Sequence, residues 1–313
     1  MSASAPTICI QSGEETSKAI SRIALMIIDD AVDRLRSDDE TALSERVHEA
    51  RKRFKEIRAV LRLVAGASGI QGQAARLLFR DAGRQLAVGR DADALVETFD
   101  EMKTHFGPAW RMRRFNKVRK ELQRRSQAEI PQPIREIAAR IEAIRPELAA
   151  WDLTSSSFEL LEPGLRDGYQ RARKRMRKAL AVRRSEAFHE WRKRVKEHWV
   201  QSRVIENIWP PIMKPQNASL HDLSRILGRH HDLAMLTELL DREPAAFGSA
   251  RYVRSFQKFV EGRMTELENE AQNLGSKLFS DEAAVWVRRI HAYWDSSELS
   301  RPLVILSEEG GRV

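Results

Sequence analysis

The sequence predicts an all-α protein built from two copies of one helical unit. Apolar residues recur at helical spacing through most of the 313 residues, and the alternation typical of β-strands is almost absent. The 15 glycines and 11 prolines lie mostly between the periodic stretches, where they end helices. The sequence also repeats itself after a shift of 141 residues, which carries Val47 onto Phe188.

The periodic stretches predict a series of helices separated by short polar segments. The expected helices span residues 14–37, 42–65, 71–88, 91–105, 109–127, 133–149, 160–184, 186–207, 216–228, 231–242, 248–274 and 281–294. The segment WDLTSSS (151–157) interrupts the periodicity near the middle of the chain, and we expect it to separate the two copies.

The repeat is clearest in one helix of each half. The shift places VHEARKRFKEIRAVLR (47–62) on FHEWRKRVKEHWVQSR (188–203). Eight of these pairs are identical, where unrelated segments would share about one or two. The identical pairs are His48/His189, Glu49/Glu190, Arg51/Arg192, Lys52/Lys193, Arg53/Arg194, Lys55/Lys196, Glu56/Glu197 and Arg62/Arg203.

The same register continues without a gap, for example from Asp81 to Asp222 and from Phe115 to Phe256. We therefore expect two tandem antiparallel helical bundles related by a pseudo-twofold axis. The expected domain covers residues 14–295, with repeats at about 14–150 and 158–295 and flexible termini at 1–13 and 300–313.

The repeated helix sorts its side chains around its axis, at roughly 100° per residue. One stripe is apolar and predicts a core seam, a second is basic, and Glu49 and Glu56 fall on a third face. The apolar stripe contains Val47, Ala50, Phe54, Ile57, Leu61 and Val64. The basic stripe contains His48, Arg51, Lys52, Lys55, Arg58 and Arg62 in the first half, and His189, Arg192, Lys193, Lys196 and Arg203 in the second.

Like charges therefore stack at i,i+3 and i,i+4 in both halves. A solvated helix normally mixes its charges, because opposite charges at this spacing stabilise it by roughly 0.2–0.5 kcal/mol per pair. The segregation favours a face that binds an anion over a merely solvated face. A second stripe extends the candidate site with Arg80 and Arg84 in the first half, beside Arg76, and His221 and Arg225 in the second.

Two further segments are strongly basic. RMRRFNKVRKELQRR (111–125) and RARKRMRKALAVRR (171–184) each contain eight Lys or Arg residues. Both a polyanion-binding surface and a simple solubilising face are consistent with such runs.

The bulk composition agrees with an anionic partner. The net charge is +9 at 32% charged residues, which favours nucleic acid, an acidic membrane or another polyanion. The single cysteine, Cys9, excludes an intrachain disulfide and favours a reducing compartment; we expect it to be exposed in a loose N-terminal segment. The N-terminus lacks a signal-peptide pattern, so a soluble cytoplasmic protein is expected.

No metal or cofactor is expected. His48 and His189 lie within the basic stripes, where an imidazole can donate a hydrogen bond to a phosphate oxygen. No carboxylate or Cys accompanies the eight histidines at ligand spacing, and the nearby Arg and Lys would repel a cation. His230 and His231 are adjacent on a helix and point about 100° apart, which rarely suits chelation.

The motif V-H-x-x-R-K-x-x-K-x-x-R-x-x-x-R at 47–62 is partly repeated at 188–203. Both copies resemble the motif of the conserved histidine α-helical domain (CHAD) family. The segments LAVGRDADAL (86–95) and LGRHHDLAML (227–236) resemble a second signature of that family. The resemblance covers residues 14–295 and implies two related helical bundles around a basic cavity or groove. It also implies binding of inorganic polyphosphate and association with polyphosphate granules.

The sequence departs from the family pattern at a few positions. Glu56 and Glu197 stand where the family often has a basic residue, and Trp199 stands opposite Arg58. We therefore expect the first half to contribute more charge than the second. The family's frequent triphosphate-processing domain is absent from this sequence, which has no E-x-E-x-K signature.

Three functions follow, in order of preference. The first is non-catalytic binding of inorganic polyphosphate along the basic helical face. The second is nucleic-acid binding, which the charge permits although no helix-turn-helix, zinc-finger or RNA-recognition signature is present. The third is an enzyme, or its accessory, that processes phosphate chains, although the sequence has no Walker loop and no acidic metal triad. The sequence leaves the oligomeric state open.

Overall fold

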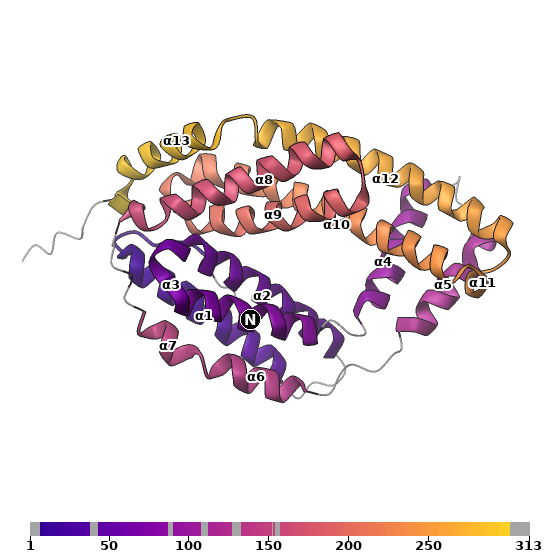
Figure 1. Ribbon diagram of the computed structural model, residues 1–313, viewed down its shortest axis with the longest axis horizontal. Coiled ribbons are helices and arrows are strands. Elements are labelled where there is room, and N and C mark those ends of the chain that lie inside the picture. Colours follow the sequence, from indigo (N-terminus) through magenta and orange to yellow (C-terminus); the bar gives the residue numbers. More distant parts are fainter. Residues whose placement is uncertain are drawn as a thin grey trace, which may run out of the picture.

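The structure, a computed structural model, describes residues 7–37, 43–86, 90–107, 112–126, 133–151, 153 and 157–300. Within these ranges every regular element is a helix, which confirms the all-α prediction (Figure 1). The predicted C-terminal tail and the middle of the predicted linker at 151–157 lie outside the described residues.

The helices of the first half are α1 (Thr16–Arg36), α2 (Leu43–Leu63), α3 (Ala65–Gln85), α4 (Arg90–Phe106), α5 (Met112–Ser126), α6 (Ile134–Glu142) and α7 (Arg145–Ala149). Most of them follow the predicted stretches within a few residues, but α3 begins six residues before the predicted 71–88 and the single helix predicted at 133–149 is divided into α6 and α7.

The second half begins with a short 3-10 turn, η3, and two more such turns, η4 and η5, follow later. Its elements are η3 (Phe158–Leu160), α8 (Glu162–Val182), α9 (Ser185–Val204), η4 (Glu206–Ile208), α10 (Pro210–Arg242), α11 (Pro244–Phe247), α12 (Ala250–Leu278), α13 (Ala283–Asp295) and η5 (Glu298–Ser300).

Helix α10 differs from the prediction of two helices at 216–228 and 231–242. It is one helix of 33 residues that passes through Gly228. This glycine does not end the helix: it is buried, and a Cβ there would lie 3.5 Å from Nε of Arg192. Gly228 is therefore an interior position of α10 and does not mark a helix boundary.

The predicted flexible N-terminus is wrong for residues 7–13. Ile8 and Ile10 are buried in the core, and the predicted exposed Cys9 is buried as well. The backbone N–H of Ile10 donates to the carbonyl of Val204 at 3.0 Å, and Asn207 donates to the carbonyl of Ile10 at 2.9 Å. Burial of two isoleucines contributes enough apolar contact to hold this short segment against the end of α9.

The described residues form two hydrophobic cores, and each uses helices from both halves. The larger core combines α1, α2, α3, α6 and α7 with α8, α9, α13 and the first part of α10. The smaller core joins α4 and α5 to α11, the second part of α10 and the first part of α12 (Figure 1). The expected tandem bundles therefore do not each close around a core of their own. Their apolar faces are completed by the other half.

Residues related by the repeat touch one another, as they must where a twofold axis passes between them. The rings of Phe115 and Phe256, equivalent in the repeat, lie 5.1 Å apart in the smaller core. Between α2 and α9, Arg62 pairs with Glu197, and Arg203 approaches Glu56 at 3.8 Å in the reciprocal contact. Both sets of contacts relate the halves by a pseudo-twofold axis.

Candidate functional site

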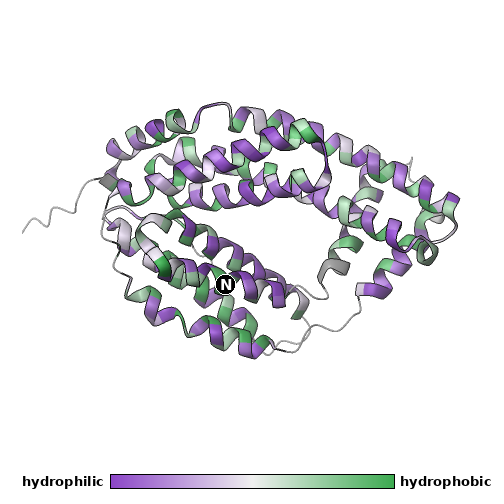
Figure 2. Ribbon diagram, in the orientation of Figure 1, coloured by the Kyte–Doolittle hydropathy of each residue, from purple (hydrophilic) through white to green (hydrophobic). Residues whose placement is uncertain are grey.

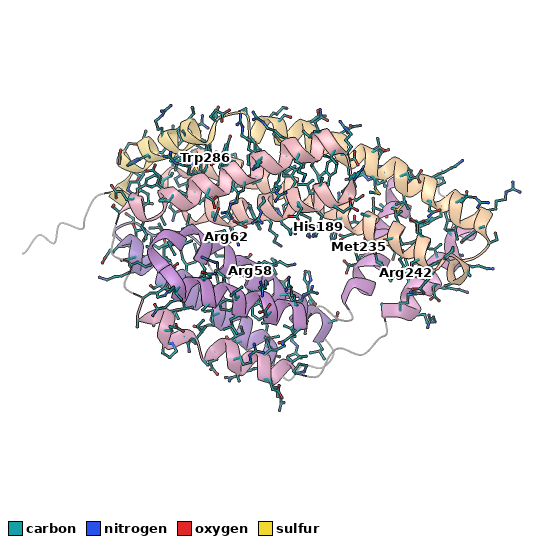
Figure 3. The ribbon with its side chains drawn as sticks, viewed as in Figure 1. Arg58, Arg62, His189, Met235, Arg242 and Trp286 are labelled. Atoms are coloured by element: carbon teal, nitrogen blue, oxygen red, sulfur yellow. The ribbon has the colours of Figure 1, made fainter. Side chains whose placement is uncertain are left out.

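Helices α2 and α9 pack against each other across this axis and bring their basic stripes together. Figure 2 shows hydrophilic positions along the sides of both helices that face the other half. Figure 3 shows Arg58 and Arg62 on α2 and His189 on α9 lying along these facing sides. Five cations form the middle of the arrangement, and we call them the central cluster: Arg51, Lys55, Arg58, Arg192 and Lys196.

The pKa of Lys55 reflects the repulsion between the cations of the central cluster. Burial, and after it the positive charges of Lys196 and Arg192, lower the pKa of Lys55 from 10.5 to about 7. Arg51 and Arg58 act in the same direction. The Lys55 side chain is nevertheless solvent-accessible. Because it is surrounded by protein atoms and still open to solvent, ions can reach it.

Lys196, its equivalent in the second half, shows the same effect. Burial, and after it the charge of Arg192, lower the pKa of Lys196 from 10.5 to about 8. The carboxylates of Glu56 and Glu49 act in the opposite direction and do not cancel the shift. Two lysines from different halves thus meet in a setting that disfavours their charged forms.

Several cations of the central cluster have few carboxylates or hydrogen-bond acceptors beside them. Among the described residues, no ion pair joins Lys55, Arg58 or Lys196 to a carboxylate. Nε of Arg192 and Nδ1 of His189 are buried and have no hydrogen-bond partner within the described part of the chain. A buried guanidinium N–H without an acceptor costs about 1–3 kcal/mol, so these atoms indicate a site for an acceptor ligand.

Two histidines border the central cluster. The rings of His189 and His231 lie 4.0 Å apart. Burial, and after it the charges of His189 and Arg192, lower the pKa of His231 to about 3. Burial also lowers the pKa of His189. Both rings are therefore largely neutral near pH 7 without a ligand, and each can offer one N–H to an anion.

The other predicted site residues surround the central cluster. His48 is half-buried and lies 4.0 Å from Glu49 rather than inside the cluster. Apart from His221, the remaining ones lie in ion pairs: Lys52 with Glu49, Lys193 with Glu190, Arg62 with Glu197, Arg203 with Glu56, Arg80 and Arg84 with Asp81, and Arg225 with Asp222.

Glu56 and Glu197, which the helical spacing places on a face apart from the basic stripe, both have side chains with little exposure to solvent. The side chain of Glu56 is only 1% exposed, and Glu197 is 11% exposed. Arg53 and Arg194, each three residues before its carboxylate, hold them at 2.5 and 2.8 Å. Each carboxylate also faces an arginine of the other half. Their physical role is to join the halves, since buried charge requires a close counter-charge.

Trp199 changes the second half of the site. Its ring stacks on His221 at 4.7 Å, and the guanidinium of Arg203 lies over it at 5.1 Å. By the repeat, Trp199 and His221 occupy the positions of Arg58 and Arg80. An aromatic stack thus replaces two guanidinium groups, as the sequence-based expectation of a more charged first half anticipated.

Sequence reasoning missed one contributor, His231, and left open the role of another, Arg171 in the basic segment 171–184. The spacing of His231 and His230 does not indicate a metal site, so no role for His231 followed from it. The only sequence feature that points to it is the family signature at 227–236. The contact between His231 and His189 joins α10 to α9, so only the fold reveals it. Arg171 of α8 acts on the pKa of Arg76 and so lies within electrostatic reach of the site. Among the described residues, no group of three His, Cys, Asp or Glu side chains is arranged to hold a metal ion.

Comparisons with known proteins agree with this architecture. A family model of the CHAD domain matches residues 26–241. The chain is similar to the crystal structure of the CHAD domain from the plant Ricinus communis, at 19% identity over 90% of this chain and 97% of that chain. The TM-score of that match is 0.55, which supports the shared fold. No curated protein matches the chain.

The fold and the site define a duplicated, all-helical protein with a cluster of cations between its halves. Because the family model covers well over half of the sequence, the chain belongs to the CHAD family. No described helix has the length and apolar character needed to cross a membrane.

Proposed function

We propose that this protein binds inorganic polyphosphate at the central cluster and does not process it. The observation that carries the proposal is the meeting of like charges from two halves around Lys55 and Lys196. Folding gathers these cations although their repulsion opposes it, as the depressed pKa values of the two lysines indicate. A bound polyanion would remove this repulsion.

The chemistry of the cluster suits a chain of phosphates. Arginines offer paired N–H donors to phosphate oxygens, and lysines offer compact charges, in charge-assisted hydrogen bonds. Arg192 has a buried Nε without an acceptor, and Arg58 joins no ion pair among the described residues. A chain with one negative charge per phosphate can satisfy several such donors at once, so affinity rises with chain length.

Nucleic acid fits less well. Nonspecific recognition of single strands depends on aromatic rings that stack on bases. Trp199 borders the site, but His221 and Arg203 already lie against its ring. A polyanion without bases needs no free aromatic ring and can bind this surface through its charges alone. The proposal extends to location: such a site would gather the protein on polyphosphate granules in the cytoplasm.

Binding of long-chain polyphosphate, tripolyphosphate, single-stranded RNA and duplex DNA at several salt concentrations tests the proposal. Polyphosphate should bind more tightly than nucleic acid of matched charge. Lys55→Ala combined with Lys196→Ala should weaken polyphosphate binding about 100-fold, if each charge-assisted contact contributes about 1.5 kcal/mol.

The matched control is Lys117→Ala combined with Lys120→Ala, two exposed lysines of α5. It removes the same charge and should change affinity less than about threefold. Loss of binding in this control alone would move the site to residues 111–125. Equal affinity for nucleic acid and polyphosphate would contradict the proposal, and release of free phosphate would point to an enzyme.

A further inference from the structure

The central cluster has two flanks that the pseudo-twofold axis relates to each other. One flank consists of α3 and α8, which pack against each other, and the positions that correspond to it through the 141-residue register lie on α10 and α1. One pair of interactions supports the correspondence of α1 with α8. Arg34 of α1 acts on the pKa of Glu49, as Arg175 of α8 acts on that of Glu190, and all four residues correspond through the 141-residue register.

The flanks differ sharply in charge. The first, which we call the α3–α8 rim, consists of Arg76, Arg80, Arg84, Arg171, Arg175 and Lys178. The equivalent positions on the other flank, the α1–α10 rim, are Asn217, His221, Arg225, Asp30, Arg34 and Ser37. Six cations on one rim thus correspond to two arginines, an aspartate and three uncharged or weakly basic residues on the other.

Local carboxylates do not remove this difference. Asp81 pairs with Arg80 on the α3–α8 rim, but its equivalent Asp222 pairs with Arg225 on the other rim. Asp167 pairs with Arg171 at 2.7 Å. The excess of positive charge therefore stays on the α3–α8 rim.

The α3–α8 rim is continuous with the central cluster. Arg80 and Arg62 lower the pKa of Arg58, which belongs to the cluster. Arg62 and Arg171 in turn act on the pKa of Arg76, which links α3 to α8. Helix α8 packs against both α2 and α3, the helices that carry Arg58 and Arg76.

The fold itself does not require these cations. At Asp30 the repeat builds the same helix with an acid in place of Arg171, and α1 ends at Arg36, just before Ser37, the counterpart of Lys178. Arg171 and Lys178 are exposed, and no ion pair neutralises Lys178 among the described residues. A set of cations that folding does not need, adjoining an anion site, indicates a ligand surface.

We propose that a polyphosphate too long for the central cluster extends from it in one direction only. The phosphates that lie beyond the cluster then bind to the α3–α8 rim. The inference rests on the proposed function and adds a direction to it. The rim has no role for a ligand short enough to lie within the cluster. It follows that α8 selects for chain length.

The test variant is Arg171→Ala, Arg175→Ala and Lys178→Ala combined, which preserves helix propensity on α8. The matched control is Arg251→Ala, Arg254→Ala and Lys258→Ala, which removes three exposed cations at similar spacing on α12. Circular dichroism and thermal melting confirm that both variants are folded. Affinities for long-chain polyphosphate and tripolyphosphate are then measured across salt concentrations.

The rim variant should lose about tenfold or more in affinity for long chains, with a salt slope lower by about 2, since each lost phosphate contact removes about 0.7. Tripolyphosphate affinity should change by less than about twofold, and the α12 variant should leave both ligands within that limit. Equal losses in the rim and α12 variants, or a rim effect on tripolyphosphate as large as that on long chains, would overturn the inference. Failure of the central double variant to weaken either ligand would instead reject the proposed function.

Discussion

Lys55 and Lys196 show how the surroundings of a lysine change its pKa. A lysine on a solvated helix keeps a pKa near its ordinary value, but these two have pKa values of about 7 and 8. Burial is the main cause in both, followed by neighbouring cations, which for Lys55 come chiefly from the opposite half. The charge of the site is therefore variable near neutral pH, and a bound polyanion favours the fully protonated state.

The pH dependence follows from the sign of this shift. Between about pH 7 and 10.5 the unfolded chain keeps a proton on Lys55 that the folded protein has lost. The stability of the ligand-free protein should therefore rise with pH through this window, relative to Lys55→Met, which has no charge to lose. Denaturant unfolding of both proteins at several pH values measures the difference, and parallel curves would contradict the shift.

Binding should show the opposite trend. A polyanion prefers protonated lysines, so polyphosphate affinity should fall as pH rises above about 7, and binding near pH 8 should take up protons. Calorimetry in buffers of different ionisation enthalpy measures this uptake, which Lys55→Met should reduce.

At the scale of elements, the close approach of α8 to α2 positions the rim beside the central cluster. Gly164 lies in the first turn of α8, and a Cβ there would come within 1.9 Å of the carbonyl oxygen of Leu63. No side-chain movement relieves a clash with backbone. Glycine is therefore required where these two helices meet.

Gly164→Ala should destabilise the protein by about 2 kcal/mol or more and disturb long-chain binding, because α8 must move away from α2. Gly262→Ala is the matched control, since this glycine lies inside α12 and an added Cβ would meet no other atom within 4 Å. There, alanine should stabilise by about 0.5–1 kcal/mol through its better helix propensity. Thermal unfolding compares the two, and equal melting temperatures would contradict the close approach.

At the scale of the whole molecule, the two halves repeat one sequence pattern but do not fold as separate units. The halves share both cores, and Phe99 of α4 stacks at 5.8 Å on Phe256 of α12. The apolar faces of α4 and α5 are covered by the other half. A half molecule would expose them to water.

The isolated segment 7–151 should therefore not fold as a stable monomer, although it contains one complete repeat. We expect it to self-associate or to bind a hydrophobic dye, while an equimolar mixture with 157–300 should regain cooperative unfolding. Size-exclusion chromatography and thermal melting distinguish these states. A monomeric, cooperatively unfolding first half would show that each repeat closes its own core.

The sequence by itself determined the helical class, the duplication and the two basic stripes. These properties depend on residue spacing along one helix, which is a local property that periodicity records directly. The departure of Trp199 from the repeat likewise anticipated the weaker charge of the second half.

Only the tertiary structure decided which charges meet. The stripe on α2 looked uniform, yet Lys55 faces Lys196 without a carboxylate partner, whereas Arg62 pairs with Glu197 of the other half. Glu197 lies apart from the basic stripe in the sequence pattern, and the fold places it in the interface between the halves. Helical spacing gives the direction of each side chain, but which surface lies opposite depends on contacts more than a hundred residues apart, and those contacts set both the pairing and the burial of the charges.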